Sequence, residues 1–209
     1  MSMIKRFFLK TVIMVWALLA TSAVAANAGL QQKLSSFDAY QATFIQQTFD
    51  SQGQSVQSIS GHITLQKPDR FFWQSDEPYA QQLVSNGQLI WHYDADLEQV
   101  VVQEYAEQLD KAPMLLVLRD ASRLADSYRV TQQEAAQGRV RFVLQAIDSQ
   151  SPLSRVELVF AGEQLVELLF VDQLQQKTLV QFANIVMNPV IDAALFDFQL
   201  PDGADVLYE

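Results

Sequence analysis

The strongest constraint on the fold is a repeated alternation of apolar and polar residues with a period of two. Val140, Phe142 and Leu144, for example, alternate with Arg139 and Arg141. Such alternation is typical of a β-strand with one face in a core and the other in solvent. The segments that favour strands are residues 40–49, 61–67, 88–94, 139–146, 155–160, 165–171 and 178–187.

Glycine-containing turn signals separate these segments at intervals of about ten residues. They are Gln52-Gly53-Gln54, Asn86-Gly87, Gln137-Gly138 and Ala161-Gly162-Glu163. This spacing predicts an antiparallel meander, sandwich or barrel. No alternation of strands with long helices is present, so a parallel dinucleotide-binding sheet is disfavoured. In residues 165–171 both strand faces are apolar, which indicates either a covering layer or a sheet curled around something apolar.

Three short segments favour helices. Leu30, Leu34 and Phe37 lie on one helical stripe, and residues 190–196 form a second candidate. Residues 112–119 begin with Pro113, which is favoured at a first helical position, and continue with five apolar residues. Because this third segment has almost no polar face, it must cover something apolar or be covered itself.

The N-terminal segment reads as a secretory signal peptide. Residues 1–10 carry three basic residues and no acid, and residues 11–20 are uncharged and apolar but too short to span a bilayer. Small residues then allow cleavage after Ala25 or Ala28. An uncleaved anchor helix is the alternative, and the short apolar core that ends in small residues disfavours it. We therefore expect a signal peptide at residues 1–25, a single domain at residues 26–209, and export to the bacterial periplasm, with plain secretion as the alternative.

Charge and residue types exclude several classes of function. The chain has 24 acidic against 14 basic residues, a net charge of −10, which disfavours nucleic-acid binding. It has no cysteine, so disulfides and thiolate metal sites are absent. The two histidines lie on predicted strands with no metal-ligand spacing, and the acidic run at residues 94–98 lacks the glycine and distal glutamate of a calcium loop. We find no catalytic motif, and predict neither enzyme activity nor a metal or cofactor.

Lys67 is the most informative single residue. It shares a strand face with Ile63 and Leu65 and is followed by Pro68, which interrupts a strand ladder. Two interpretations stay open: a side chain that lies along apolar surface with its ammonium in water, or a polar latch that bonds carbonyls of a covering element. Phe71 and Trp73 follow nearby, and such aromatic residues serve either a core or a ligand pocket.

Four segments together resemble the LolA family of periplasmic lipoprotein carriers, over about residues 30–206. They are GHITLQKPDRFFWQSDEP at 61–78, SNGQLIWHYDADLEQV at 85–100, APMLLVLR at 112–119 and DAALFDFQLPDG at 192–203. The resemblance implies a mainly β fold: an unclosed antiparallel β-barrel with short helices as a lid over an apolar cavity. It also implies that acyl chains of lipoproteins occupy this cavity.

The resemblance also suggests roles for individual residues. Lys67 stands where the family has an arginine that bonds lid backbone; it keeps a charge and donors but not the planar guanidinium. The segment that contains Pro113, Met114, Leu115, Leu116 and Leu118 would form the lid. Residues expected to line the cavity, or else to be plain core, are Phe44, Leu65, Phe71, Trp73, Trp91, Phe142 and Leu169.

The implied partners are acylated lipoproteins, the inner-membrane release complex LolCDE and the outer-membrane receptor LolB, with the carrier itself a monomer. LolB is lipidated on an N-terminal cysteine, and this chain has none. Two alternatives remain from the residues alone. One is a sensor or carrier of another amphiphile on the same fold, and the other is a small β-barrel hydrolase, which clustered carboxylates or paired histidines in a pocket would favour.

Overall fold

The structure is a computed structural model that describes residues 25–108, 118 and 124–209, and it is dominated by strands. In chain order the elements are β1 (Ala39–Phe49), β2 (Ser55–Gln66), β3 (Arg70–Ser75), β4 (Gln81–Asn86), β5 (Leu89–Asp94), β6 (Gln99–Glu104), α2 (Tyr105–Gln108), α4 (Leu124–Ser127), β7 (Tyr128–Ala135), η2 (Ala136–Gly138), β8 (Arg139–Ala146), β9 (Leu153–Ala161), β10 (Gln164–Asp172), β11 (Lys177–Met187), η3 (Ala193–Phe196) and β12 (Asp205–Tyr208). Residues 25–35 form a helix ahead of β1.

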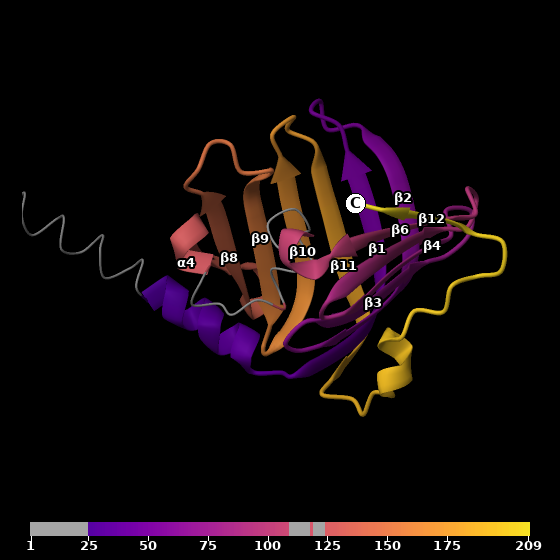
Figure 1. The fold of residues 1–209 in the computed structure, drawn as a ribbon. Helices are drawn as coiled ribbons and strands as arrows, with labels where there is room; N and C mark the ends of the chain where they lie inside the picture. Colours follow the sequence, from indigo (N-terminus) through magenta and orange to yellow (C-terminus); the bar gives the residue numbers. More distant parts are fainter. Residues whose placement is uncertain (1–24, 109–117, 119–123) are drawn as a thin grey trace, which may run out of the picture.

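All twelve of these strands belong to one curled sheet (Figure 1). The order is β12-β6-β5-β4-β3-β2-β1-β11-β10-β9-β8-β7, so β1 lies near the middle, between β2 and β11. Neighbouring strands are antiparallel except β12, which adds to β6 in parallel. Within the described residues no pairing joins β12 to β7, and the sheet stays unclosed. The predicted unclosed antiparallel fold is therefore confirmed.

The alternation in the sequence corresponds to the two faces of this sheet. On the concave face Phe142 lies opposite Leu158, which lies opposite Leu168, which lies opposite Val180. These four side chains are each at most 1% exposed, so they form a row of core across β8 to β11. Burial of a large apolar side chain contributes about 1.5–3 kcal/mol, and such rows hold the curled sheet together.

The convex face carries the charged residues of the same strands. Glu157 Oε1 lies 2.5 Å from Arg155 Nη2, and Glu157 Oε2 lies 3.3 Å from Arg141 Nε. The alternation predicted that these three side chains oppose Val156, Leu158 and the other apolar positions, and the structure confirms it. The two guanidinium groups flank a carboxylate that would otherwise be buried without a counter-charge.

The helix of residues 25–35 covers the concave face at β7 and β8 (Figure 1). Ala26, Leu30 and Leu34 point into the core, and Phe37 follows just beyond the helix end. The packing is close, because a Cβ added at Gly29 would lie 2.9 Å from the side chain of Gln132 on β7. The predicted stripe of Leu30, Leu34 and Phe37 is therefore buried as expected.

The C-terminal segment covers part of the convex face. Phe196 of η3 is buried against Phe72 and Val84, with Trp91 and Phe198 packed beside them. The helix predicted at residues 190–196 is wrong in extent, because only Ala193–Phe196 forms a 3₁₀ turn, opened by the Asp192 side chain accepting from the Ala194 N–H.

The apolar segment 112–119 lies outside the described residues except for Leu118, which is 3% exposed and belongs to the main core. In the part of the chain that the structure describes, no helix has the length and apolar character to cross a bilayer.

Candidate functional site

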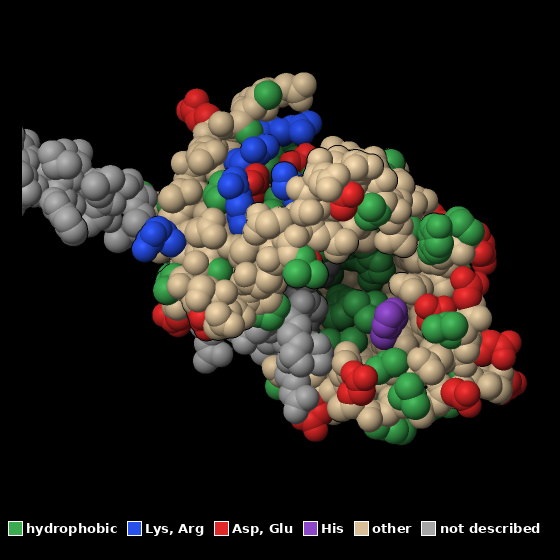
Figure 2. Space-filling view, turned by 90° about the horizontal axis from the view of Figure 1, so that it is seen from above, with side chains coloured by type: hydrophobic (Ala, Val, Ile, Leu, Met, Phe, Trp, Pro, Cys, Tyr) green, Lys and Arg blue, Asp and Glu red, His purple; other side chains and the backbone are tan. Residues whose placement is uncertain are grey.

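A pocket of about 350 Å³ opens on the concave face where the helix of residues 25–35 does not cover it (Figure 2). Figure 2 shows a hollow with hydrophobic side chains at its base and a histidine at its wall. The walls come from β1 to β5 on one side and β10 and β11 on the other. Its lining residues are Gln46, Ile59, Ile63, Phe71, Trp73, Ser75, Gln81, Leu83, His92, Phe170 and Val180.

Aromatic packing shapes the base of this pocket. The Phe44 ring stacks on the Trp73 indole with centroids 3.7 Å apart and planes inclined by 26°. Phe44 lies opposite Gly61, and a Cβ at Gly61 would come within 2.8 Å of the Phe44 ring. The absence of a side chain at Gly61 therefore leaves room for the Phe44 ring, which packs on Trp73, a residue of the pocket lining.

The rim of the pocket is polar and its hydrogen bonds are largely satisfied. Gln81 Nε2 donates to Asp94 Oδ2 at 2.8 Å, and Ser75 Oγ donates to Tyr79 O at 2.6 Å. The bond from Gln81 and those from the Leu97 and Asp96 N–H groups hold the pKa of Asp94 below its ordinary value. Asp94 is thus ionised at neutral pH, and the rim carries a fixed negative charge.

Lys67 bonds the helix of residues 25–35 at the closed end of the concave face. Its Nζ donates to the Leu34 carbonyl and lies 4.0 Å from the centre of the Phe37 ring. Burial lowers the pKa of Lys67, whereas the charge of Asp38 acts in the opposite direction. A cation placed on a carbonyl of the last helical turn satisfies one of the acceptors that a helix end leaves unpaired, and it also complements the helix dipole.

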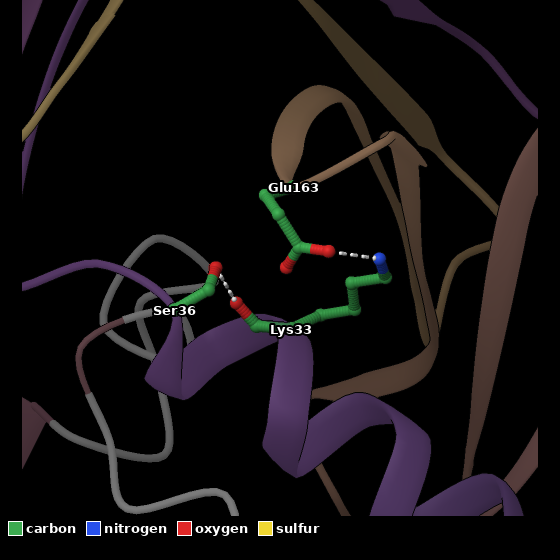
Figure 3. Close-up of polar contacts among 3 residues, drawn as sticks. All are labelled: Lys33, Ser36 and Glu163. Carbon is green, nitrogen blue, oxygen red and sulfur yellow. Dashed lines mark hydrogen bonds and ion pairs between the residues drawn. The ribbon is translucent and has the colours of Figure 1, made fainter.

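A second contact holds this helix on the far side. Lys33 Nζ donates at 2.7 Å to Oε1 of Glu163, which lies in the turn between β9 and β10 (Figure 3). Ser36 Oγ donates to the Lys33 carbonyl at 2.7 Å and closes the helix end. The bond from Lys33 lowers the pKa of Glu163. The helix is therefore tied to both β2, through Lys67, and the β9–β10 turn.

The structure brings together only some of the predicted cavity residues. Phe71 and Trp73 line the pocket, and Phe44 stacks on Trp73. Leu65 and Phe142 face the same side of the sheet but are fully buried in the core, so they do not contact the pocket space.

Trp91 and Leu169 were expected in the pocket lining, and the structure places both on the convex side. The Trp91 ring stacks there with Phe198 at 5.9 Å between centroids. Leu169 lies opposite Glu157, on the convex side of β10, whereas its neighbour Phe170 reaches the pocket. Both β5 and β10 have apolar residues on their convex and concave faces. The convex face is covered in part by the C-terminal segment, and the concave face is buried in part by the curl of the sheet. Alternation alone therefore could not select the inner face.

The proposed lid falls mostly on residues that are not described: Pro113, Met114, Leu115 and Leu116 lie outside the described ranges. Leu118 is buried in the main core. The lining residues that were not among the predicted cavity residues are the apolar Ile59, Ile63, Leu83, Phe170 and Val180 and the polar Gln46, Ser75, Gln81 and His92. Leu83 could have been found from its pairing with Trp73, once β3 and β4 are recognised as a hairpin. Within the described residues, no three histidine or acidic side chains gather into a metal-binding group.

Comparison with known proteins places this geometry in a family. The model of the family described as outer membrane lipoprotein carrier protein LolA matches residues 35–199. The chain belongs to the LolA family. A LolA-family relative from Hahella chejuensis, named outer-membrane lipoprotein carrier protein, is 35% identical over 197 residues, covering 92% of this chain and 94% of the relative. A relative of the same name from Azotobacter vinelandii is 36% identical over 180 residues, covering 86% of each chain.

Solved structures resemble the LolA-type fold of this chain at low sequence identity. An uncharacterized conserved protein from Thermus thermophilus aligns with a TM-score of 0.54 and 12% identity, covering 87% of this chain and 99% of that one. A putative outer membrane lipoprotein-sorting protein domain from Vibrio parahaemolyticus aligns with a TM-score of 0.50 and 12% identity, covering 84% and 97%. At this identity the likeness supports the unclosed sheet and nothing finer.

Proposed function

We propose that this protein is a periplasmic carrier that binds the acyl chains of lipoproteins released from the inner membrane and delivers them to the outer membrane. One observation carries the proposal: the lipoprotein carrier family matches residues 35–199, which include every strand that builds the pocket. The open, mostly apolar pocket supports it, because acyl chains need an apolar surface shielded from water.

The energy of exposed acyl chains explains why such a carrier is needed. A lipoprotein with three acyl chains of about 15 methylenes each exposes hydrocarbon worth about 36 kcal/mol, at about 0.8 kcal/mol per methylene. No such molecule crosses water unaided at a useful rate. The carrier must also release its cargo, so its affinity has to stay well below this limit. Loading, carriage and delivery then need no bond chemistry in the pocket.

An empty apolar pocket is an aggregation hazard, so the carrier needs a way to cover it. In our proposal the segment with Pro113, Met114, Leu115, Leu116 and Leu118 is the lid over the pocket. The bond from Lys67 to Leu34 supports a latch role for Lys67, since it ties a covering helix to the strand that leads into the pocket wall. Opening must require only a few kcal/mol, within reach of a ligand that prefers the open state.

The proposed transport from the inner to the outer membrane implies a partner at each membrane. The carrier would receive lipoproteins from the inner-membrane complex LolCDE and pass them to the outer-membrane receptor LolB, acting as a monomer. Residues 1–25 would direct export and be removed after Ala25 or Ala28. The excess of acidic residues is consistent with a carrier that stays in the aqueous compartment between two anionic membranes, because the like charges of carrier and lipid headgroups repel each other.

The test measures release of a lipoprotein into solution. Inner-membrane vesicles that hold a labelled lipoprotein and the energised release machinery are mixed with the purified mature protein. We expect a soluble complex of carrier and cargo, followed by transfer to vesicles that carry the receptor. Absence of any soluble complex with the intact protein would overturn the proposal.

Two adjacent residues give a matched pair of variants. Phe170→Asp places a charge in the pocket, whereas Leu169→Asp places the same charge on the convex face of the same strand. We expect the first to abolish loading and the second to retain it, with thermal unfolding measured for both.

The latch is tested with Lys67→Leu, which removes the bond to Leu34 but keeps the apolar stem. A latch predicts altered loading or altered release in the same assay. Unchanged rates of both would remove Lys67 from the mechanism.

A further inference from the structure

We propose that His92 is a recognition site for the acyl carbonyl of the bound lipid, and that it orients the cargo with its hydrocarbon tails deep and its polar linkage at the rim. This inference rests on the carrier function proposed above and adds a specific polar contact to an otherwise apolar pocket. It is carried by the position of His92 between two rows of side chains of opposite character.

The strand register arranges the concave face in rows that run across the sheet. The deep row is mostly apolar and buried, with Leu65 opposite Phe71 and Ser85 opposite Ile90. The middle row consists of Ile63, Trp73, Leu83 and His92, in successive register from β2 to β5. Ile63 and Leu83 are aliphatic and Trp73 has only an indole N–H on a large apolar ring, so His92 is the most polar member of these four.

The third row is polar and marks the outer end of the pocket. Ser75 lies at the end of β3 and accepts the Gln81 N–H at 3.0 Å, and Gln81 lies opposite Asp94. The turns beyond this row, at residues 76–79 and 96–98, are exposed. At the opposite end Phe37 and Lys67 cover the sheet. An acyl chain therefore enters past the third row, and its tail lies towards the deep row.

His92 has hydrogen-bonding capacity to offer at this boundary. Gln81 and Ser75 already donate to Asp94 and to the Tyr79 carbonyl. Within the described part of the chain, neither ring nitrogen of His92 takes part in a hydrogen bond; its resolved interaction is the electrostatic one with Asp94. Gln46 lies further out, opposite Ile59. The imidazole is half-buried beside Leu83 and Val101, which flank it in register.

The chemistry of the ring determines what it would recognise. An imidazole carries at least one N–H donor, one in its neutral form and two when protonated. Leaving that donor unpaired beside bound hydrocarbon costs free energy, whereas an acyl carbonyl supplies the acceptor it needs. Esters and amides both carry such a carbonyl, and an ether-linked chain of the same length does not. The pocket should therefore discriminate between acyl and alkyl lipids.

The experiment measures the affinity of the purified protein for three fluorescent lipids that share chain length and headgroup. Their chains are joined by esters, by amides or by ethers. We expect the ester probe, the amide probe or both to bind roughly three- to ten-fold more tightly than the ether probe, as one hydrogen bond provides. Which carbonyl is preferred identifies the linkage that His92 contacts.

Variants assign that preference to His92. His92→Phe should abolish the preference for the ester and amide probes over the ether probe, and His92→Gln, which keeps a donor, should retain part of that preference. His62→Phe is the matched control, because His62 is exposed on the convex face opposite Gln74 and should keep the full preference. His92→Leu repeats the test with a smaller side chain if the phenylalanine variant does not fold.

The outcomes separate this inference from the carrier proposal. If the wild-type protein binds all three probes equally, or His92→Phe keeps the preference, the role of His92 is wrong and the carrier function stands. If the wild-type protein binds none of the probes, both proposals fail.

Discussion

The two halves of the concave face show how one sequence pattern gives two different results. In the half built by β8 to β10, Phe142 and Phe160 meet edge to face at 5.9 Å, and both are almost fully buried. In the half built by β2 to β5, Trp73 and Leu83 remain half-exposed and border the pocket. The strands alternate in the same way in both halves. What differs is the cover, because the helix of residues 25–35 packs against β7 and β8, whereas in the other half it is bonded only beyond the end of β2, through Lys67 and Leu34.

The test of this difference with the largest expected effect compares two phenylalanine-to-alanine substitutions. Phe142→Ala removes a ring from the packed half and should lower the free energy of unfolding by about 3–5 kcal/mol. Phe170→Ala removes a half-buried ring from the pocket and should cost less than about 2 kcal/mol while weakening lipid binding. Urea denaturation and a lipid-binding titration measure both effects. Equal losses of stability would show that the pocket half is as tightly packed as the other.

Two glycine-to-alanine substitutions, one in each half, test the comparison by adding a single methyl group. Gly61→Ala places a Cβ 2.0 Å from the Gln74 carbonyl and 2.8 Å from the Phe44 ring, so we expect a loss of about 1–3 kcal/mol. Gly29→Ala is the control in the helix of the packed half, where the nearest atom belongs to the flexible Gln132 side chain. There the helix preference for alanine should make the change neutral or stabilising by up to about 1 kcal/mol. Thermal unfolding of both variants ranks them.

Tyr40 lies where the two halves meet, and it gives a pH-dependent test. Its hydroxyl donates to the Leu165 carbonyl at 2.7 Å, so Tyr40→Phe should cost about 1 kcal/mol at pH 7. Burial raises the pKa of Tyr40 above its ordinary value of about 10, so the folded state disfavours the phenolate. The stability from Tyr40 is therefore fully present below pH 10 and is lost as pH rises beyond it.

The free energy of unfolding of Tyr40→Phe should consequently fall less than that of the wild type between pH 9 and 11. Denaturation experiments across that range measure both. Parallel curves for the two proteins would contradict the assignment to Tyr40.

The smallest effect concerns the tie between the helix and the β9–β10 turn. A double-mutant cycle with Lys33→Ala and Glu163→Ala should give a coupling energy below about 1 kcal/mol, because half of the Glu163 side chain is exposed and salt screens the pair. The coupling should shrink further in 1 M salt. A coupling well above this value would mean that the ion pair, rather than apolar packing, holds the helix on the sheet.

The sequence predicts seven of the twelve strands that the structure describes, because the alternation in those seven is clear and local. β8 was predicted with its observed bounds, and Gly53, Gly87, Gly138 and Gly162 all take the positive φ that their predicted turns require. The strands β3, β4, β6, β7 and β12 were not identified, because their apolar and polar residues do not alternate clearly, unlike those of the equally short β5.

The site was harder to predict because burial on a curled sheet depends on distant segments. Trp91 and Phe71 look alike in sequence, each in an apolar strand that ends near a turn. Phe198, more than 100 residues away in the chain, packs on the first, whereas the second faces the pocket. His92 looked like an ordinary strand histidine, and only the register that places it beside Leu83 shows that it borders apolar space. Such cross-chain information is not contained in local periodicity.

The open seam between β7 and β12, which no ladder of the described strands closes, has a mechanical consequence. In a closed barrel the circumference is fixed by the number of strands and their stagger, and widening it means breaking a ladder of backbone bonds. Here no ladder of the described strands joins the β7 and β12 margins, so a change of curvature alone would move them apart with each of the eleven ladders intact. In the carrier role proposed above, cargo of different girth would be accommodated by bending of the sheet, and the sheet would return to its original curvature when the cargo leaves.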